Sequence, residues 1–148
     1  MIALLLAIQA ASGQAASGID GSPLGPIARQ QLPATGCAVF LWSAGERREL
    51  VAMASAEPAR LRVTIDGRAV DLARAEQQGV VSFGFSGTTR YRTAGVEVAL
   101  DMAIVMDPAL TQGGTVPSAA LTLSRPGRDS VVLPVAGLIG CAGATPGH

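Results

Sequence analysis

The segment Arg60-Leu-Arg-Val-Thr-Ile-Asp-Gly-Arg-Ala-Val-Asp-Leu-Ala73 carries the clearest structural signal in this chain of 148 residues. Asp66-Gly67 is a preferred two-residue turn of β-hairpins, and apolar and polar residues alternate on both sides of it. Pairing across this turn places apolar side chains on one face and an opposite-charge pair on the other, so the register is self-consistent. The expected pairs are Val63 with Val70, Leu61 with Leu72, and Arg62 with Asp71.

A second hairpin is expected around Arg125-Pro-Gly-Arg-Asp129, because Pro followed by Gly favours a type II turn. Pro134 follows in the second strand of this hairpin. Since proline has no N–H to donate, we expect this strand to lie at a sheet edge or to carry a bulge at that position. The expected pairs are Leu123 with Val131, Leu121 with Leu133, and Ala119 with Val135.

The longest alternation of apolar residues runs from Gly95 to Met106. A helix would scatter its apolar and acidic residues around the axis, so the pattern favours a strand. We expect one helical turn over Ala73–Gln78, closed by Gly79. Two further strand pairs are expected: Ala38–Ser43 with Arg48–Ala54, and Val80–Ser86 with Thr89–Thr93.

This succession of short strands and turns predicts an all-β protein. The expected fold is a small antiparallel β-sandwich of about eight strands, immunoglobulin-like or jelly-roll-like, and a small β-barrel is the alternative. We divide the chain into a signal peptide over 1–15, a flexible Gly/Pro-rich arm over 16–36, the β-sandwich domain over 37–142 and a C-terminal tail over 143–148.

The expected signal peptide consists of the apolar run Met1–Ile8 followed by small residues. Gly13 and Ala15 suit cleavage after Ala15, although no basic residue precedes the apolar run. A membrane-spanning helix needs about 20 apolar residues, and this run is much shorter. The sequence therefore predicts a periplasmic or secreted protein with no membrane span after signal removal.

The two cysteines, Cys37 and Cys141, bracket the predicted β domain. In an oxidising compartment such a pair is most simply a disulfide that ties the first strand to the last. Alternation places Cys37 on the same face as Leu41, toward the core. Phe40 and Trp42 then face the other way and need cover from loops or from a partner.

Composition excludes several classes of chemistry. The chain contains no Lys and a single His, the terminal His148. Schiff-base chemistry, phosphate-loop lysines and His-dependent catalytic triads are therefore not expected, and neither is a four-ligand zinc site. Eleven Arg balance eleven Asp and Glu, so the formal net charge is zero, which argues against a nucleic-acid partner. We expect no cofactor and no metal.

Candidate binding residues form two groups. Four arginines, two on each of two predicted strands, form an anion-binding face if those strands are neighbours; the alternative is a solvated face neutralised by Asp66, Asp71 and Glu97. Glu97 and Asp101 are the carboxylates considered for a hydrolase, although exposure of Asp101 is the simpler interpretation. The four arginines are Arg60, Arg62, Arg90 and Arg92.

The functional hypothesis is a non-catalytic exported protein with a binding, assembly or envelope-structural role and a protein or envelope partner. Two alternatives remain. One is a small hydrolase that uses carboxylates only. The other is a carrier of a small apolar ligand, whose internal void would be lined by Met102, Ile104 and Met106.

Overall fold

The structure is a computed structural model and describes residues 18–107, 109 and 113–142. The predicted signal peptide and C-terminal tail lie outside these residues. A short 3-10 helix, η1 (Ile19–Gly21), and a two-residue strand, β1 (Leu24–Gly25), precede the main strands. The main strands are β2 (Cys37–Ser43), β3 (Leu50–Ser55), β4 (Arg60–Ile65), β5 (Arg68–Gln78), β6 (Thr88–Thr93), β7 (Val96–Met106), β8 (Gly113–Ser124) and β9 (Val131–Cys141).

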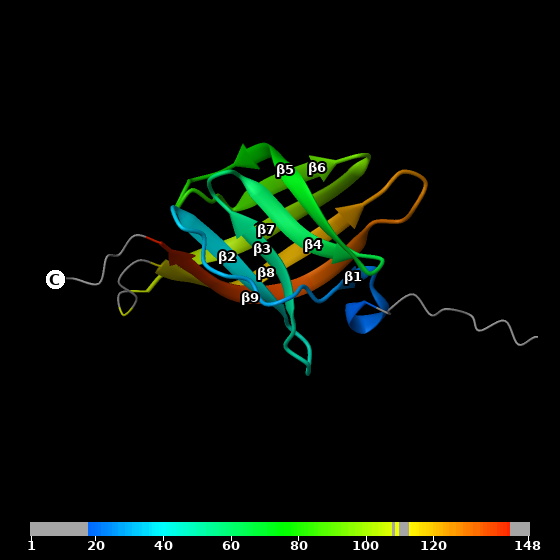
Figure 1. Cartoon of the computed structure of the whole chain (residues 1–148), viewed down its shortest axis with the longest axis horizontal. Helices are drawn as coiled ribbons and strands as arrows, with labels where there is room; N and C mark the ends of the chain where they lie inside the picture. The colour runs from blue at the N-terminus through cyan, green and yellow to red at the C-terminus, as the bar shows by residue number, and fades with distance from the viewer. Residues whose placement is uncertain (1–17, 108, 110–112, 143–148) are drawn as a thin grey trace, which may run out of the picture.

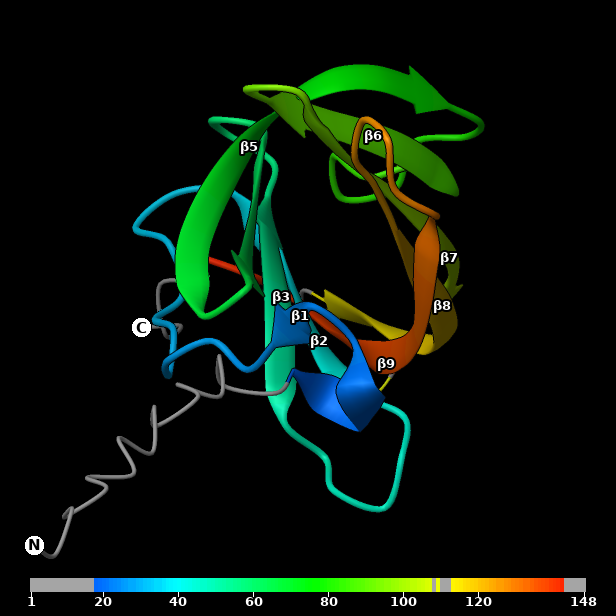
Figure 2. The same ribbon diagram turned by 90° about the vertical axis from the view of Figure 1, so that its right-hand side faces the viewer.

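Strands β2 to β9 form a closed antiparallel barrel in which each strand pairs with the next along the chain (Figure 1). The sheet closes because β9 returns to pair with β2, while β4 and β5 pair on the other side. Figure 2 shows the strands surrounding a common interior. The short strand β1 pairs with β4. The all-β prediction is confirmed, and the barrel considered as the alternative is the architecture that these strands adopt. Closure removes exposed sheet edges.

Both predicted hairpins have the expected register. Leu61 lies opposite Leu72 in the β4–β5 hairpin, and Leu121 lies opposite Leu133 in the β8–β9 hairpin. The first turn has φ values of 49° at Asp66 and 80° at Gly67. Two successive positive φ values define the turn that matches the twist of paired strands, which explains why this dipeptide is such a strong signal.

Apolar side chains fill the interior of the barrel. An eight-stranded barrel has an interior that side chains can fill, and every main strand contributes buried residues to it. Tyr91 and Phe85 are the largest fully buried side chains. Members of the core cluster include Val39, Leu41, Ala52, Leu61, Val63, Leu72, Tyr91, Val98, Leu100, Leu121, Leu123, Leu133, Val135 and Ile139.

Two local predictions are wrong. Ala73–Gln78 continues β5 instead of forming a helical turn, with a register shift between Arg74 and Glu76. Val80–Ser86 does not form a strand, and β6 pairs with β5 in its place. The physical reason is a tight reversal at Phe83 and Gly84, both with positive φ, which leaves only an isolated bridge.

Pro134 lies in a strand with neighbours on both sides, not at a sheet edge. The pairing of β2 with β9 ends at Ser43 and Val135, and Val135 is the residue that follows the proline. Its missing N–H therefore costs no ladder bond to β2, and its carbonyl accepts a hydrogen bond from Ala44 N at 3.2 Å.

The segment before β2 packs on the barrel. Ile19, Leu24 and Ile27 are buried, and β1 pairs Leu24 with Ile65. The Ile27 N–H donates to the carbonyl of Leu50 at 2.8 Å. In Figure 1, η1 lies toward the opposite end of the barrel from the C-terminal end of β9. No helix in the described part of the chain is long and apolar enough to cross a membrane.

Candidate functional site

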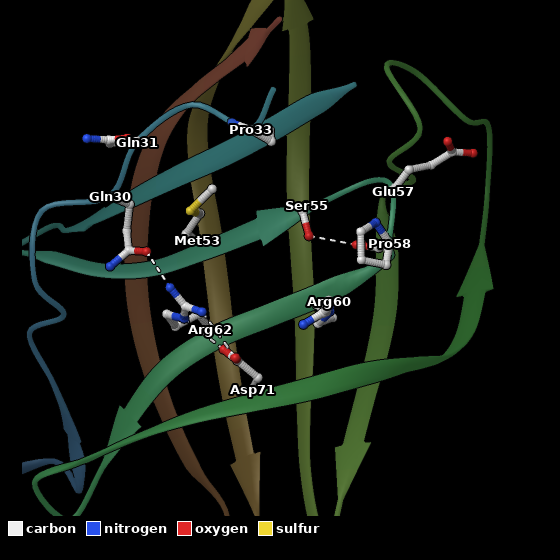
Figure 3. A pocket seen from close by; sticks show the side chains of 10 residues that line it. All are labelled: Gln30, Gln31, Pro33, Met53, Ser55, Glu57, Pro58, Arg60, Arg62 and Asp71. Carbon is white, nitrogen blue, oxygen red and sulfur yellow. Dashed lines mark hydrogen bonds and ion pairs between the residues drawn. The ribbon is translucent and has the colours of Figure 1, made fainter. Parts of the chain in front are cut away.

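A cleft of about 340 Å³ lies on the outer side of the barrel, between the chain segment 30–33 and strands β3 to β5 (Figure 3). The segment 30–33, called the strap below, forms one wall, and β4 forms the other. The residues that line the cleft are Gln30, Gln31, Pro33, Met53, Ser55, Glu57, Pro58, Arg60, Arg62 and Asp71.

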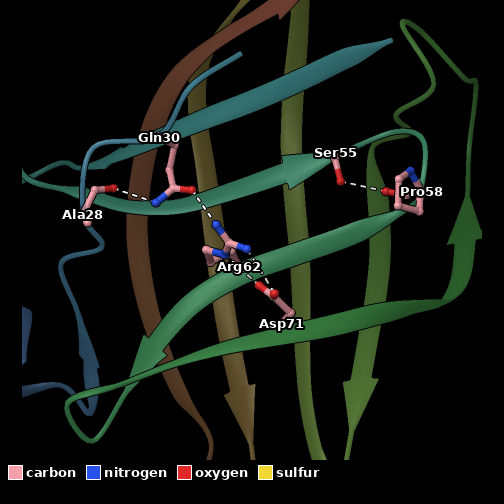
Figure 4. A network of polar contacts seen from close by, with 6 residues as sticks. All are labelled: Ala28, Gln30, Ser55, Pro58, Arg62 and Asp71. Atoms are coloured by element: carbon pink, nitrogen blue, oxygen red, sulfur yellow. Dashed lines mark hydrogen bonds and ion pairs between the residues drawn. The ribbon is translucent and has the colours of Figure 1, made fainter. Parts of the chain in front are cut away.

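A polar network ties the strap to the barrel (Figure 4). Arg62 donates from Nε and Nη2 to the two carboxylate oxygens of Asp71, at 2.8 and 3.1 Å, and from Nη1 to Gln30 Oε1 at 2.8 Å. Gln30 in turn donates to the carbonyl of Ala28 at 2.7 Å. Such a two-bond guanidinium–carboxylate pair fixes orientation as well as charge. The hydrogen bonds from Arg62 lower the pKa of Asp71, and the same contact raises the pKa of Arg62.

Arg60 lies two residues before Arg62, on the same outer face of β4, and its side chain is exposed. It forms no ion pair with any residue that the structure describes. Its charge reaches Asp71 through space and makes a smaller contribution to the lowered pKa of that carboxyl group. Arg60 is therefore the cleft's available cation, because the charge of Arg62 is already matched.

Next to Arg60, the turn between β3 and β4 is held by a hydrogen bond from Ser55 Oγ to the carbonyl of Pro58, 2.7 Å long. Glu57 belongs to the same turn and also lines the cleft. Gln31 lies across from them on the strap (Figure 3). The cleft thus combines the unmatched guanidinium of Arg60 and the carboxylate of Glu57, which forms no ion pair with a described residue, with neutral amide and hydroxyl groups that can bind a polar chain.

The other two predicted arginines, Arg90 and Arg92, lie on β6, and β5 separates them from β4. Arg92 donates from Nε to Glu97 at 2.8 Å and lies 3.6 Å from Glu76, while Arg90 lies 3.7 Å from Glu97. The four arginines are therefore not gathered into one site. Arg62, Arg90 and Arg92 lie against carboxylates, which matches the predicted alternative of a neutralised face. Asp66, which was expected to contribute to this neutralisation, pairs with Arg125 instead, at 2.7 Å.

The two carboxylates considered for hydrolysis lie apart. Glu97 and Asp101 are four residues apart on β7, which separates their backbones by about 13 Å. Paired glycosidase carboxylates lie within about 9.5 Å of each other. Asp101 is exposed, as expected, and accepts a hydrogen bond from Thr88 Oγ1 at 2.9 Å. Across the described residues, no three His, Cys, Asp or Glu side chains gather in a way that could hold a metal ion.

The three residues expected to line an apolar void separate in the structure. Met102 is buried, Ile104 is half-buried and Met106 is 65% exposed. The cause is a register shift between Ala103 and Val105, which turns the end of β7 away from the barrel interior.

The predicted disulfide joins Cys37 to Cys141, with 3.9 Å between the Cα atoms. The two cysteines face each other in register where β2 pairs with β9. The bond therefore lies on the seam that closes the barrel.

Sequence reasoning missed the strap as a wall of the cleft. Its Gly and Pro content predicted an arm without regular structure, and glutamines carry no periodic signal. Ile27 could have indicated that this segment packs on the barrel, because an apolar residue in a polar segment can anchor that segment to a core.

Comparisons of the chain with family models, with curated proteins and with solved structures found no match.

Proposed function

We propose that this chain is an exported, non-catalytic protein that acts by binding a partner at the outer surface of its barrel. The observation that carries the proposal is the cleft beside the strap, where Arg60 keeps an unmatched charge next to the neutralised pair of Arg62 and Asp71. A guanidinium of this kind binds carboxylates through two parallel hydrogen bonds. The ligand proposed for the cleft is the carboxylate end of a polar chain, such as a peptide C-terminus.

Two observations support export. The disulfide is consistent with an oxidising compartment, since such bonds are rare in the cytosol. The N-terminal sequence has the apolar run and small residues of a signal peptide. Fractionation of a bacterial host that expresses the full chain tests this, with the mass of the recovered protein as the readout. We expect a periplasmic protein that begins at Ala16 and has no free thiol. A full-length cytosolic protein with two free thiols would contradict export.

Binding is tested by NMR titration of the folded protein with N-acetyl tetra-alanine, compared with the same peptide ending in an amide. We expect the free carboxylate to shift amide signals of residues 30–33 and 55–60, and the amide form to bind about tenfold more weakly, as for loss of one charge-assisted hydrogen bond. Arg60→Gln should weaken binding to the same extent. Arg68→Gln is the matched control, because Arg68 is an exposed arginine that does not line the cleft. Equal binding of both peptides would contradict the proposed ligand class.

A further inference from the structure

A larger hollow, of about 660 Å³, lies on the wall formed by β2, β9 and β8. We call it the Trp42 groove. Its volume falls within the range of small-molecule sites, about 300–1,000 Å³. The residues that line it are Trp42, Ser43, Ala44, Arg48, Val116, Pro117, Ala136, Gly137 and Leu138.

Two register shifts lie close to this groove, one between β2 and β3 and one between β8 and β9, while the pairing of β2 with β9 is regular. The pairing of β2 with β3 shifts register between Leu41 and Trp42, and that of β8 with β9 shifts between Val116 and Ala119. Bulges of this kind bend a strand and redirect its side chains, and they are common beside binding sites. Gly137 lies between the two irregularities and adds no side chain to the space.

Apolar side chains dominate the surface of the groove. Leu138 is 43% exposed and Trp42 is half-buried, which is a large apolar surface left in contact with water. Phe40 packs beside Trp42 with the ring centres 6.4 Å apart, so the indole is supported from one side. Ser43 Oγ is already engaged as a donor to the carbonyl of Arg47, at 2.7 Å.

A single charge accompanies this apolar surface. Arg48 is the one ionisable residue that lines the groove, and no ion pair joins it to a residue in the described part of the chain. Two acidic residues flank it in the stretch Glu46-Arg47-Arg48-Glu49, but the structure forms no ion pair among these four described residues. A long apolar surface next to one cation is complementary to a molecule with an apolar chain and one anionic head.

We propose that the Trp42 groove binds an amphipathic monocarboxylate, a straight-chain fatty acid of medium length, with its chain along Trp42 and Leu138 and its carboxylate on Arg48. This site is separate from the cleft beside the strap and does not rest on the function proposed for that cleft. Each methylene group that the groove buries should tighten binding about fourfold until the groove is full.

Trp42 is the only tryptophan of the chain, so its fluorescence reports on this groove directly. The probes are octanoate, decanoate and decyltrimethylammonium, each kept below its micelle concentration, added to the full disulfide-bonded protein. We expect a saturable change in emission with decanoate, tighter binding than octanoate, and weak or no binding of the cationic amphiphile.

Three variants locate the site. Arg48→Gln should weaken decanoate binding roughly three- to tenfold, as for loss of a partly solvated ionic hydrogen bond. Arg47→Gln is the matched control, since Arg47 is the adjacent exposed arginine and does not line the groove. Ala136→Leu fills the groove from its outer side and should abolish binding while the far-ultraviolet circular dichroism stays unchanged.

The proposal is overturned by the absence of a saturable change at millimolar decanoate. It is also overturned if Arg48→Gln and Arg47→Gln bind equally, or if decyltrimethylammonium binds as tightly as decanoate, because the carboxylate then makes no specific contact.

Discussion

Two walls of the barrel share one kind of interior but differ completely on the outside. The strands β2, β8 and β9 contain no Asp, Glu or Arg, and their outer faces expose apolar residues such as Val132 and Leu138. The strands β4, β5 and β6 carry several ion pairs on their outer faces. Closure of the barrel dictates the inner pattern, since every strand must present apolar residues inward. It leaves the outer pattern free, so the contrast between the outer faces of the two walls is not a requirement of the fold.

The largest expected effect on stability concerns the two seams that close the barrel, the pairing of β2 with β9 and the pairing of β4 with β5. The β2–β9 seam has a covalent bond, whereas the β4–β5 seam has only hydrogen bonds and an ion pair. Replacing Cys37 and Cys141 together by Ser should lower the free energy of unfolding by about 4 kcal/mol, because the bond no longer restricts a loop of about 100 residues in the unfolded chain. Urea denaturation measures this. Equal stability of the variant and the oxidised parent would show that the seam needs no covalent bond.

The second effect tests how closely β2 and β9 approach each other in the wall whose strands contain no charged residue. A Cβ at Gly137 would overlap the backbone carbonyl of Phe40, whereas one at Gly140 would meet only the end of the Leu32 side chain, at 3.1 Å. Gly137→Ala should therefore cost about 3 kcal/mol, as for a severe overpacking, and Gly140→Ala less than about 1 kcal/mol. Thermal or urea unfolding of the two variants gives the comparison. Similar values for both would contradict the close contact between β2 and β9.

The third effect concerns the interior that both walls share. Burial raises the pKa of Tyr91 to about 12 from its ordinary value near 10, so the unfolded chain loses this proton first. The contribution of Tyr91 to stability should be fully present below pH 10. The free energy of unfolding should then fall by about 2–3 kcal/mol as the pH rises to 12. The chain has no Lys and one Tyr, so no lysine ammonium and no second phenol contributes to this window. Absorbance at 295 nm follows the phenolate, and Tyr91→Phe should remove the dependence. A midpoint near pH 10 would contradict burial.

The smallest expected effect on stability comes from the outer face of β4, β5 and β6, where the ion pairs lie. The pair of Arg62 and Asp71 is largely exposed, so Asp71→Asn should cost no more than about 1 kcal/mol at neutral pH. Because the folded pKa of Asp71 is lowered, its contribution is present above about pH 4 and disappears as the pH falls further. Parent and variant should therefore converge in acid. A difference that persists below pH 2 would show that the residue acts through packing.

The sequence predicted the parts of the fold that depend on local pairing. Asp66-Gly67 and Pro126-Gly127 set the turns, and alternation set the faces, so both hairpin registers followed. Alternation of apolar and polar residues does not distinguish a sandwich from a barrel. That distinction depends on whether β2 pairs with β9, and these two strands are nearly the whole domain apart in sequence. The tight turn at Phe83 was hidden because an apolar, aromatic segment has the composition of a strand.

The binding surfaces were harder to predict than the fold. Arg60 and Arg62 were recognised from their shared face on one strand, but their separation from Arg90 and Arg92 depends on β5, which sequence alone did not place between them. The Trp42 groove lies beside two register shifts. Pro117 marks one of them, because a proline inside a strand indicates a bulge, but the shift after Leu41 has no sequence signal of its own.

We expect the two walls to bind different ligands, and one pair of NMR titrations on the same isotope-labelled protein tests this. We expect decanoate to shift amide signals of β2, β8 and β9 around Trp42, and the tetra-alanine carboxylate to shift signals of β3, β4 and the strap around Arg60. Each ligand should leave the signals of the other wall unchanged. Shifts by both ligands on one wall, or by neither ligand on its own wall, would contradict the account.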